Sequence, residues 1–173
     1  MNESRQEEPW LRGTLNDVAP VPRAVVHALE LAKEDIERWC GGLSDDQINA
    51  RPFGIAPLAF HIRHIARSID RLLTYAEARP LTAEQFAALK TELDDGATQN
   101  QLVAELGPAF EKSVERIRAL DATRLNDPRE VGRQRRPTTV GGLLIHVAEH
   151  TQRHVGQAIT TAKIVTAQHQ SEC

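Results

Sequence analysis

Histidines are the residues of this chain with the clearest capacity for chemistry. Five of the seven in the 173-residue chain fall in two short segments: His61 and His64, three residues apart, and His146, His150 and His154, at intervals of four. On an α-helix, residues three or four apart lie on adjoining turns of one face, so two imidazoles can converge on one ion. A third ligand comes from the other segment if packing brings the two together. The pattern predicts a divalent-metal site of histidines with at least one open position.

The spacing leaves the third ligand undecided. A lone histidine on a helix is most often solvated or hydrogen-bonded. Two sets of histidines at helical spacing, on helices that can pack together, are harder to explain in that way and favour a metal site. On a helical wheel, His61 lies about 60° nearer the centre of the apolar stripe of its helix than His64, so periodicity alone favours His61.

Glu149 precedes His150, which is not the HExxH order of metalloproteases, and a zinc peptidase is therefore disfavoured.

A second cluster, of arginines, precedes the segment that carries the last three histidines. It contains Arg129, Arg133, Arg135 and Arg136. Such a stretch is usually a solvated loop, but guanidinium groups also bind carboxylates and phosphates well, so Arg133, Arg135 and Arg136 are candidates for an anion-binding mouth. No aromatic residues are interleaved with them, and stacking on single-stranded nucleic acid has no support here.

Composition narrows the class of protein. A formal net charge of −3 and a pI near 6.2 offer no basic field for nucleic acid or an anionic membrane surface, so neither is expected as a partner. No apolar run approaches the roughly 18 residues of a membrane span, and the first residues do not read as a signal peptide, which favours a cytoplasmic location. Cys40 and Cys173 form no CxxC pair, and we assign them neither a disulfide nor a catalytic role.

The elements that must position the histidines are expected to be helices. Hydrophobic residues make up 40% of the chain and charged residues 26%, as in ordinary folded domains. The apolar residues recur at spacings of three and four, and no strand-like alternation is long enough to suggest a sheet. We therefore predict an all-α four-helix bundle with four long helices and one short helix, over residues 21–40, 57–79, 81–90, 99–120 and 138–166.

Breaks in the pattern set the expected boundaries. Pro108 should either kink the third long helix or mark its start. Residues 121–137 lack periodicity and are expected to form a connecting loop. The chain then divides into a flexible N-terminal arm at residues 1–20, one helical domain at 21–166 and a C-terminal tail at 167–173.

Two histidine segments resemble motifs of the DinB-like family. HVAEHTQRHVGQ, from His146 to Gln157, resembles the last helix of that family, and PLAFHIRHIARSIDRLL resembles its second helix. The resemblance implies an up-down-down-up four-helix bundle that binds a divalent metal through one histidine of the second helix and two of the last. It assigns His64, His150 and His154 as ligands, and leaves His61 and His146 as secondary candidates.

The resemblance also bears on function. The family includes thiol-dependent transferases and isomerases, and its members frequently form homodimers. A three-histidine site with an open position can activate water or a thiol, and histidine ligation suits zinc or nickel. We hypothesise a metal-dependent enzyme, a thiol S-transferase or hydrolase, acting on a low-molecular-weight thiol or a small anionic substrate. The alternative is a non-catalytic metal-binding bundle with a structural or stress-related role, in which a fourth ligand such as His61 closes the site.

Overall fold

The computed structural model describes residues 7–172, without the side chains of residues 171 and 172. Residues 1–6 of the expected arm and residue 173 of the expected tail lie outside this range. The chain is mainly helical, as the sequence predicts. In order, its elements are η1 (Pro9–Leu11), α1 (Pro20–Cys40), α2 (Asp45–Asn49), η2 (Pro52–Gly54), α3 (Leu58–Ala76), α4 (Ala83–Lys90), α5 (Gln99–Ala119), η3 (Ala122–Arg124), β1 (Pro128–Val131), β2 (Arg136–Thr139) and α6 (Val140–Glu172).

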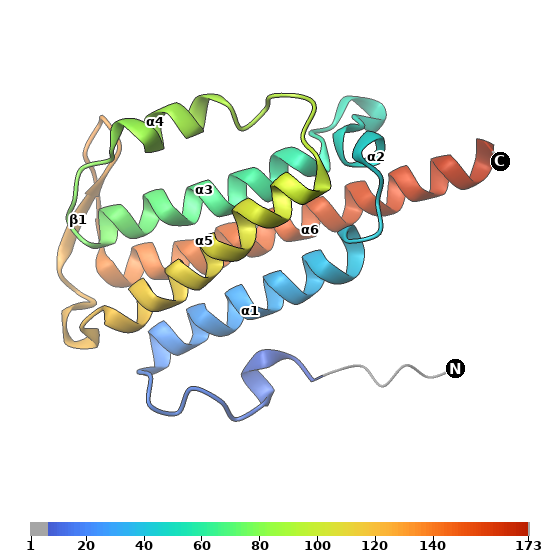
Figure 1. The fold of residues 1–173 in the computed structure, drawn as a ribbon. Helices are drawn as coiled ribbons and strands as arrows, with labels where there is room; N and C mark the ends of the chain where they lie inside the picture. The colour runs from blue at the N-terminus through green and yellow to red at the C-terminus, as the bar shows by residue number, and fades with distance from the viewer. Residues whose placement is uncertain (1–6, 173) are drawn as a thin grey trace.

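Four long helices pack around one core. In Figure 1, α1 and α6 run in one direction and α3 and α5 in the other, with α4 crossing outside the packed helices. Helix α6 packs against both α1 and α3, and α5 packs against the same two helices. Each long helix turns its apolar stripe inward, which is how amphipathic helices bury their apolar faces. The largest fully buried side chains include Leu29 of α1, Ile65 and Ile69 of α3, Ile117 of α5 and Leu144 of α6.

Local sequence explains where α4 and α5 begin. Thr82 and Thr98 each cap the backbone N–H three residues later, and Gln85 and Gln101 return the bond with their side chains. These reciprocal capping boxes satisfy backbone donors that the first turn of a helix leaves free. Pro57, expected as the first residue of the second long helix, is instead the N-cap of α3.

Two sequence expectations about the elements need correction, and the two alternatives given for Pro108 are reduced to one. Residues 128–131 and 136–139 pair as an antiparallel hairpin, although residues up to 137 were expected within a loop and residues 138 and 139 at the start of the last helix. The structure continues α5 through Pro108 rather than starting a helix there. Helix α6 extends to Glu172, so its end near residue 166 was wrong. In the segment before α1, Arg12 donates to both carboxylate oxygens of Glu34 at 2.6 and 2.8 Å.

None of the described helices combines the length and apolar character that a membrane span requires.

Candidate metal centre

The histidine cluster lies where α3 packs against α6. One ring nitrogen from each of His64, His150 and His154 lies within 4.8 Å of the other two. Residues 150 and 154 are one helical turn apart on α6, so their side chains leave the same face. His64 reaches the same point from α3, which packs against α6. The two segments that sequence spacing singled out therefore meet in space.

Four ring nitrogens in this cluster face one another in two pairs. Nε2 of His64 lies 2.8 Å from Nε2 of His150, and Nδ1 of His61 lies 3.0 Å from Nδ1 of His154. In each pair, one nitrogen must donate a proton, or both lone pairs must face an ion. Two nitrogens bonded to one zinc ion at about 2.1 Å in tetrahedral geometry lie about 3.4 Å apart. A shift of roughly half an ångström would thus open the His64–His150 pair to a metal.

The environment keeps several of these rings neutral. Burial, together with the neighbouring His64, lowers the pKa of His61 to about 4 and that of His150 to about 4. Burial and the surrounding histidines lower the pKa of His154 to about 3. Imidazole must be neutral to ligate a metal. At neutral pH these rings are therefore in the protonation state that metal binding requires. The Nδ1 atom of His150 is also buried without a hydrogen-bond partner in the described structure, so no protein group competes for it.

The buried ion pair of Glu92 and Arg71 orients the ring of His64. Nδ1 of His64 lies 2.7 Å from Oε2 of Glu92, and Arg71 donates to Oε1 of the same carboxylate at 2.7 Å. Burial alone would raise the pKa of Glu92, but hydrogen bonds from His64 and Arg71 outweigh it and lower the pKa. A carboxylate on one ring nitrogen fixes the tautomer that presents the other nitrogen to a metal. Glu92 thus turns Nε2 of His64 toward His150.

Phe60 forms an aromatic wall at the cluster. Its ring stacks on that of His64 with centroids 5.3 Å apart, and it meets the edges of His61 at 5.1 Å and of His154 at 6.0 Å. Residue 60 is itself only partly buried. An apolar ring beside a metal-binding cluster limits the access of water and fixes ring orientation.

A cavity of about 370 Å³ opens beside the cluster. His61 lines it, and so do Arg153, Gln157 and Thr161 of α6. His61 is buried and is at the same time in contact with His154. The cavity therefore reaches the histidines by way of His61, and its polar side chains include a guanidinium group.

The remaining sequence candidates lie at the edge of the cluster or away from it. The ring centroid of His146 is 5.2 Å from that of His150. His146 is partly exposed, and its Nδ1 lies 2.9 Å from a carboxylate oxygen of Glu149. Arg133, Arg135 and Arg136 are exposed in and beside the turn of the hairpin, and none of the three lines the cavity beside the histidines.

Sequence reasoning missed Phe60, Arg71, Glu92 and Arg153, which the structure places at the site. Glu92 follows α4 with no periodic signal, and its partners are 28 and 21 residues away. The position of Arg153 in the sequence, between His150 and His154, could have identified it as a candidate. His27, a lone histidine outside both segments, is buried, and its Nε2 lies 3.2 Å from the hydroxyl oxygen of Thr14.

Comparison with known proteins places the chain in a family. Residues 28–158 match the DinB superfamily, and the chain belongs to it. The crystal structure of a conserved protein from Enterococcus faecalis is similar, with a TM-score of 0.72 and 18% sequence identity. That similarity covers 87% of this chain and 99% of the other, and at this level of identity it concerns the fold alone. Curated protein sequences contain no match to this chain.

Proposed function

We propose that this protein is a metal-dependent enzyme in which His64, His150 and His154 hold one divalent ion, zinc or nickel. The observation that carries the proposal is the convergence of three imidazole nitrogens within 4.8 Å. The directions of the four long helices further support an up-down-down-up bundle as the frame. In such bundles, metal sites form from side chains on facing helices.

Each residue of the site then has a defined task. When bound, a divalent ion supplies Lewis acidity, which lowers the pKa of a water molecule or thiol at its open position. Glu92 holds His64 in one tautomer through the 2.7 Å contact, and Arg71 keeps that carboxylate ionised. Phe60 restricts water beside the rings. These roles fit a thiol S-transferase or a hydrolase, since both need an activated nucleophile in a restricted site.

The cavity beside His61 indicates the class of substrate. Arg153 supplies a positive charge there, and the side chains of Gln157 and Thr161 supply hydrogen-bonding groups. We infer a small anionic substrate, such as a low-molecular-weight thiol that carries a carboxylate, because a guanidinium group binds carboxylates in a defined geometry. The exposed arginines of the hairpin could add to this site only from a partner chain or after a rearrangement.

One observation favours a second candidate, a non-catalytic metal site. Nδ1 of His61 lies 3.0 Å from Nδ1 of His154, close enough for a modest movement to bring His61 to the same ion. Four histidine ligands would close the coordination sphere and make the site structural. The number of ligands therefore separates the enzyme from a metal-stabilised bundle.

Metal analysis tests the site itself. We expect protein purified without chelator to carry about one divalent ion per chain by mass spectrometry, and His150→Ala and His154→Ala to lose it. His64→Ala should lose it too, whereas His61→Ala should retain it. His146→Ala is the matched control, since His146 is on the same helix and pairs with Glu149 instead. Full occupancy in the variants at positions 150 and 154 would refute the assignment.

X-ray absorption on zinc-loaded protein distinguishes the two candidates. The enzyme proposal expects three nitrogen ligands and the same spectrum for His61→Ala. The structural alternative expects four nitrogens in the wild type and three in that variant. An activity screen with several low-molecular-weight thiols would follow for the three-ligand outcome, with Arg153→Gln expected to raise KM for an anionic substrate more than it lowers kcat.

We also propose that the protein is a homodimer. Phe53 is 85% exposed and Trp39 is 42% exposed, and aromatic residues are enriched in interfaces. A dimer could bring the hairpin arginines of one chain near the histidine cavity of its partner. Sedimentation at micromolar concentration tests this, because a single species at the 19.2 kDa chain mass would reject it.

A further inference from the structure

A second cavity, distinct from the one beside the histidines, lies between α1 and α5. It also measures about 370 Å³. Its walls are largely apolar and come mainly from three helices, with Ile36 and Cys40 from α1, Leu58 and Ile62 from α3, and Leu102 and Leu106 from α5. All six are buried core residues. Helix α3 contributes to both cavities, since Ile62 lines this one and the adjacent His61 lines the other.

The size of this cavity sets it apart from ordinary packing defects. Protein interiors are close-packed, and their few voids rarely exceed a water molecule. An engineered cavity of about 150 Å³ already stays dry and binds benzene, and small-molecule sites begin at about 300 Å³. A cavity of about 370 Å³ is therefore in the range of a binding site. Scaling from benzene gives room for roughly 15 non-hydrogen atoms.

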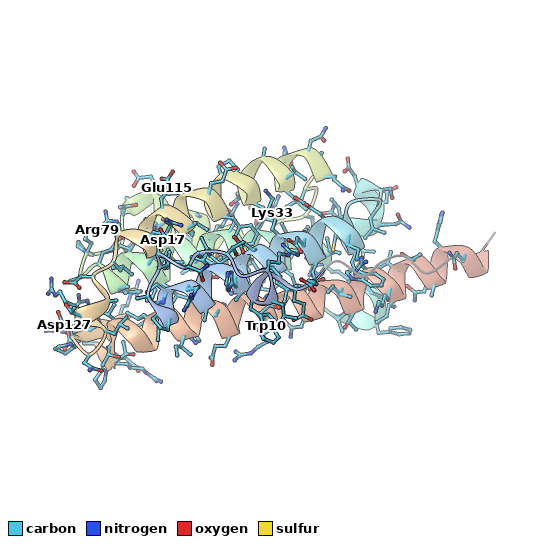
Figure 2. All side chains as sticks on the ribbon, turned by 90° about the horizontal axis from the view of Figure 1, so that it is seen from below. Trp10, Asp17, Lys33, Arg79, Glu115 and Asp127 are labelled. Atoms are coloured by element: carbon cyan, nitrogen blue, oxygen red, sulfur yellow. The ribbon has the colours of Figure 1, made fainter. Side chains whose placement is uncertain are left out.

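The chemistry of the walls selects the occupant. Cys40 acts here as an apolar group, because burial raises the pKa of its thiol to about 11 and keeps it protonated. The charged side chains that line the cavity are Lys33 and Glu37, exposed and one turn apart on α1. Figure 2 shows Lys33 on the side of α1 that faces α5. Because the two charges are opposite, the mouth offers neither a net positive nor a net negative field.

From these observations we propose that the α1–α5 cavity binds a small uncharged apolar molecule, mostly hydrocarbon, of about 15 non-hydrogen atoms. A carboxylate or an ammonium group would find one favourable and one unfavourable charge at the mouth. Gln99 also lines the cavity, and its Oε1 is buried without a hydrogen-bond partner in the described structure. This oxygen can accept one hydrogen bond from a neutral group such as a hydroxyl, which is compatible with an uncharged, mostly hydrocarbon occupant. The site is independent of the metal centre and does not depend on the function proposed for it.

A neutral fluorescent probe tests this proposal on the full-length protein. We expect N-phenyl-1-naphthylamine, which is uncharged, to bind with increased fluorescence and to raise the unfolding temperature. Ile36→Phe and Leu106→Phe fill the cavity from opposite helices, and each should weaken binding about tenfold or more, since apolar burial is lost to the new ring. Ala104→Phe is the matched control: it adds the same ring at an exposed position of α5 outside the cavity, and should bind as the wild type does. His64→Ala should also bind normally.

The unfolding temperature of the two Phe variants without probe is a second readout, which keeps the test informative if a variant folds poorly. Filling a real void should leave the unfolding temperature unchanged or raise it, whereas overpacking a filled core lowers it. Unfolded or strongly destabilised Phe variants would therefore overturn the proposal. Equal probe binding by the wild type and both filled variants would overturn it as well. Stronger binding of the anionic 1-anilinonaphthalene-8-sulfonate than of the neutral probe would refute the stated chemistry. Dissociation of a dimer by the filling variants would identify a second copy as the occupant, and would also overturn it.

Discussion

Two helix–helix contacts in the bundle differ in what they bury: the α3–α6 contact buries polar groups, and the α1–α5 contact buries apolar groups around a cavity. Between α3 and α6, the buried groups include imidazoles whose nitrogens meet at 2.8 and 3.0 Å. Behind them, the buried pair Glu92 and Arg71 is held by charge-assisted bonds. Between α1 and α5, the walls are apolar and enclose about 370 Å³ of space. Hydrogen bonds between polar groups determine the packing of the α3–α6 side, whereas the α1–α5 side depends on how apolar side chains fill space.

This difference shows which perturbations each side can tolerate. A buried polar group that loses its partner keeps its desolvation penalty, so the α3–α6 side should be sensitive to single deletions. An apolar side chain beside an existing cavity makes fewer van der Waals contacts than one in a filled core. Truncating it should therefore remove fewer contacts and cost less stability. The two sides should therefore respond differently to the same kind of substitution.

The largest effect is expected at the buried ion pair. Glu92→Ala leaves the guanidinium of Arg71 buried without its carboxylate and should lower the free energy of unfolding by about 3 to 5 kcal/mol. The same change removes the group that orients His64 and should weaken metal affinity by roughly 10- to 100-fold. Urea unfolding of the metal-free protein and metal titration measure the two effects separately.

The Arg67–Glu105 pair is the matched control for that substitution. It also joins α3 to another element, with a 2.5 Å contact, but Glu105 is 34% exposed whereas Glu92 is 6% exposed. Glu105→Ala should cost about 1 kcal/mol or less and leave metal affinity unchanged. If both substitutions cost the same, burial does not set the importance of Glu92, and the comparison between the two sides fails.

The histidine pair of α6 could be anticipated because its geometry is local. Residues 150 and 154 share one helix, and a spacing of four places them on one face whatever the rest of the fold does. The choice between His61 and His64 depends on the tertiary structure. The wheel was right that His61 lies nearer the core, since it is buried and His64 only partly so. Yet His64 is the residue that lies within 4.8 Å of the α6 pair.

Other features were missed for physical reasons that can be named. The hairpin has strands of four residues with Pro128 and Pro137 in them, and proline is a poor strand residue whose pairing depends on context. The last turns of α6 lack an apolar stripe, so periodicity gave no reason to continue beyond residue 166. Glu92 belongs to a connection whose role comes entirely from long-range contacts, which one sequence does not reveal.

A pair of leucine truncations tests the volume side of the comparison. Leu144 of α6 is fully buried in the core, whereas Leu106 of α5 is buried at the wall of the apolar cavity. Leu144→Ala should cost about 4 kcal/mol, and Leu106→Ala should cost about 2 kcal/mol because part of its surroundings is already empty. Urea unfolding of both variants gives the difference. Equal costs would mean that Leu106 is packed as tightly as Leu144, and that the cavity is closed in solution.

The last expected effect concerns pH, and it tests the polar side. Burial lowers the pKa of His61 and His150 to about 4 and that of His154 to about 3, against about 6.5 in the unfolded chain. Between these values the unfolded chain binds more protons, so stability is full above about pH 6.5 and falls as the pH drops toward about 4. Each ring contributes at most about 1.4 kcal/mol per pH unit, and the partly exposed His150 and His154 contribute less.

Two measurements on the metal-free protein check this window. Urea unfolding between about pH 7 and about pH 4 should show a decline that is shallower in His61→Phe, which removes one titrating ring at a buried position. Metal binding to the folded protein should follow a different course. Proton competition at His150 and His154 should begin only near their lowered pKa values, below the onset near 6.5 that unperturbed imidazoles predict. Stability that stays constant down to about pH 4 would show that these rings are solvated in the folded protein, and the contrast between a partnered polar side and an apolar side would not hold.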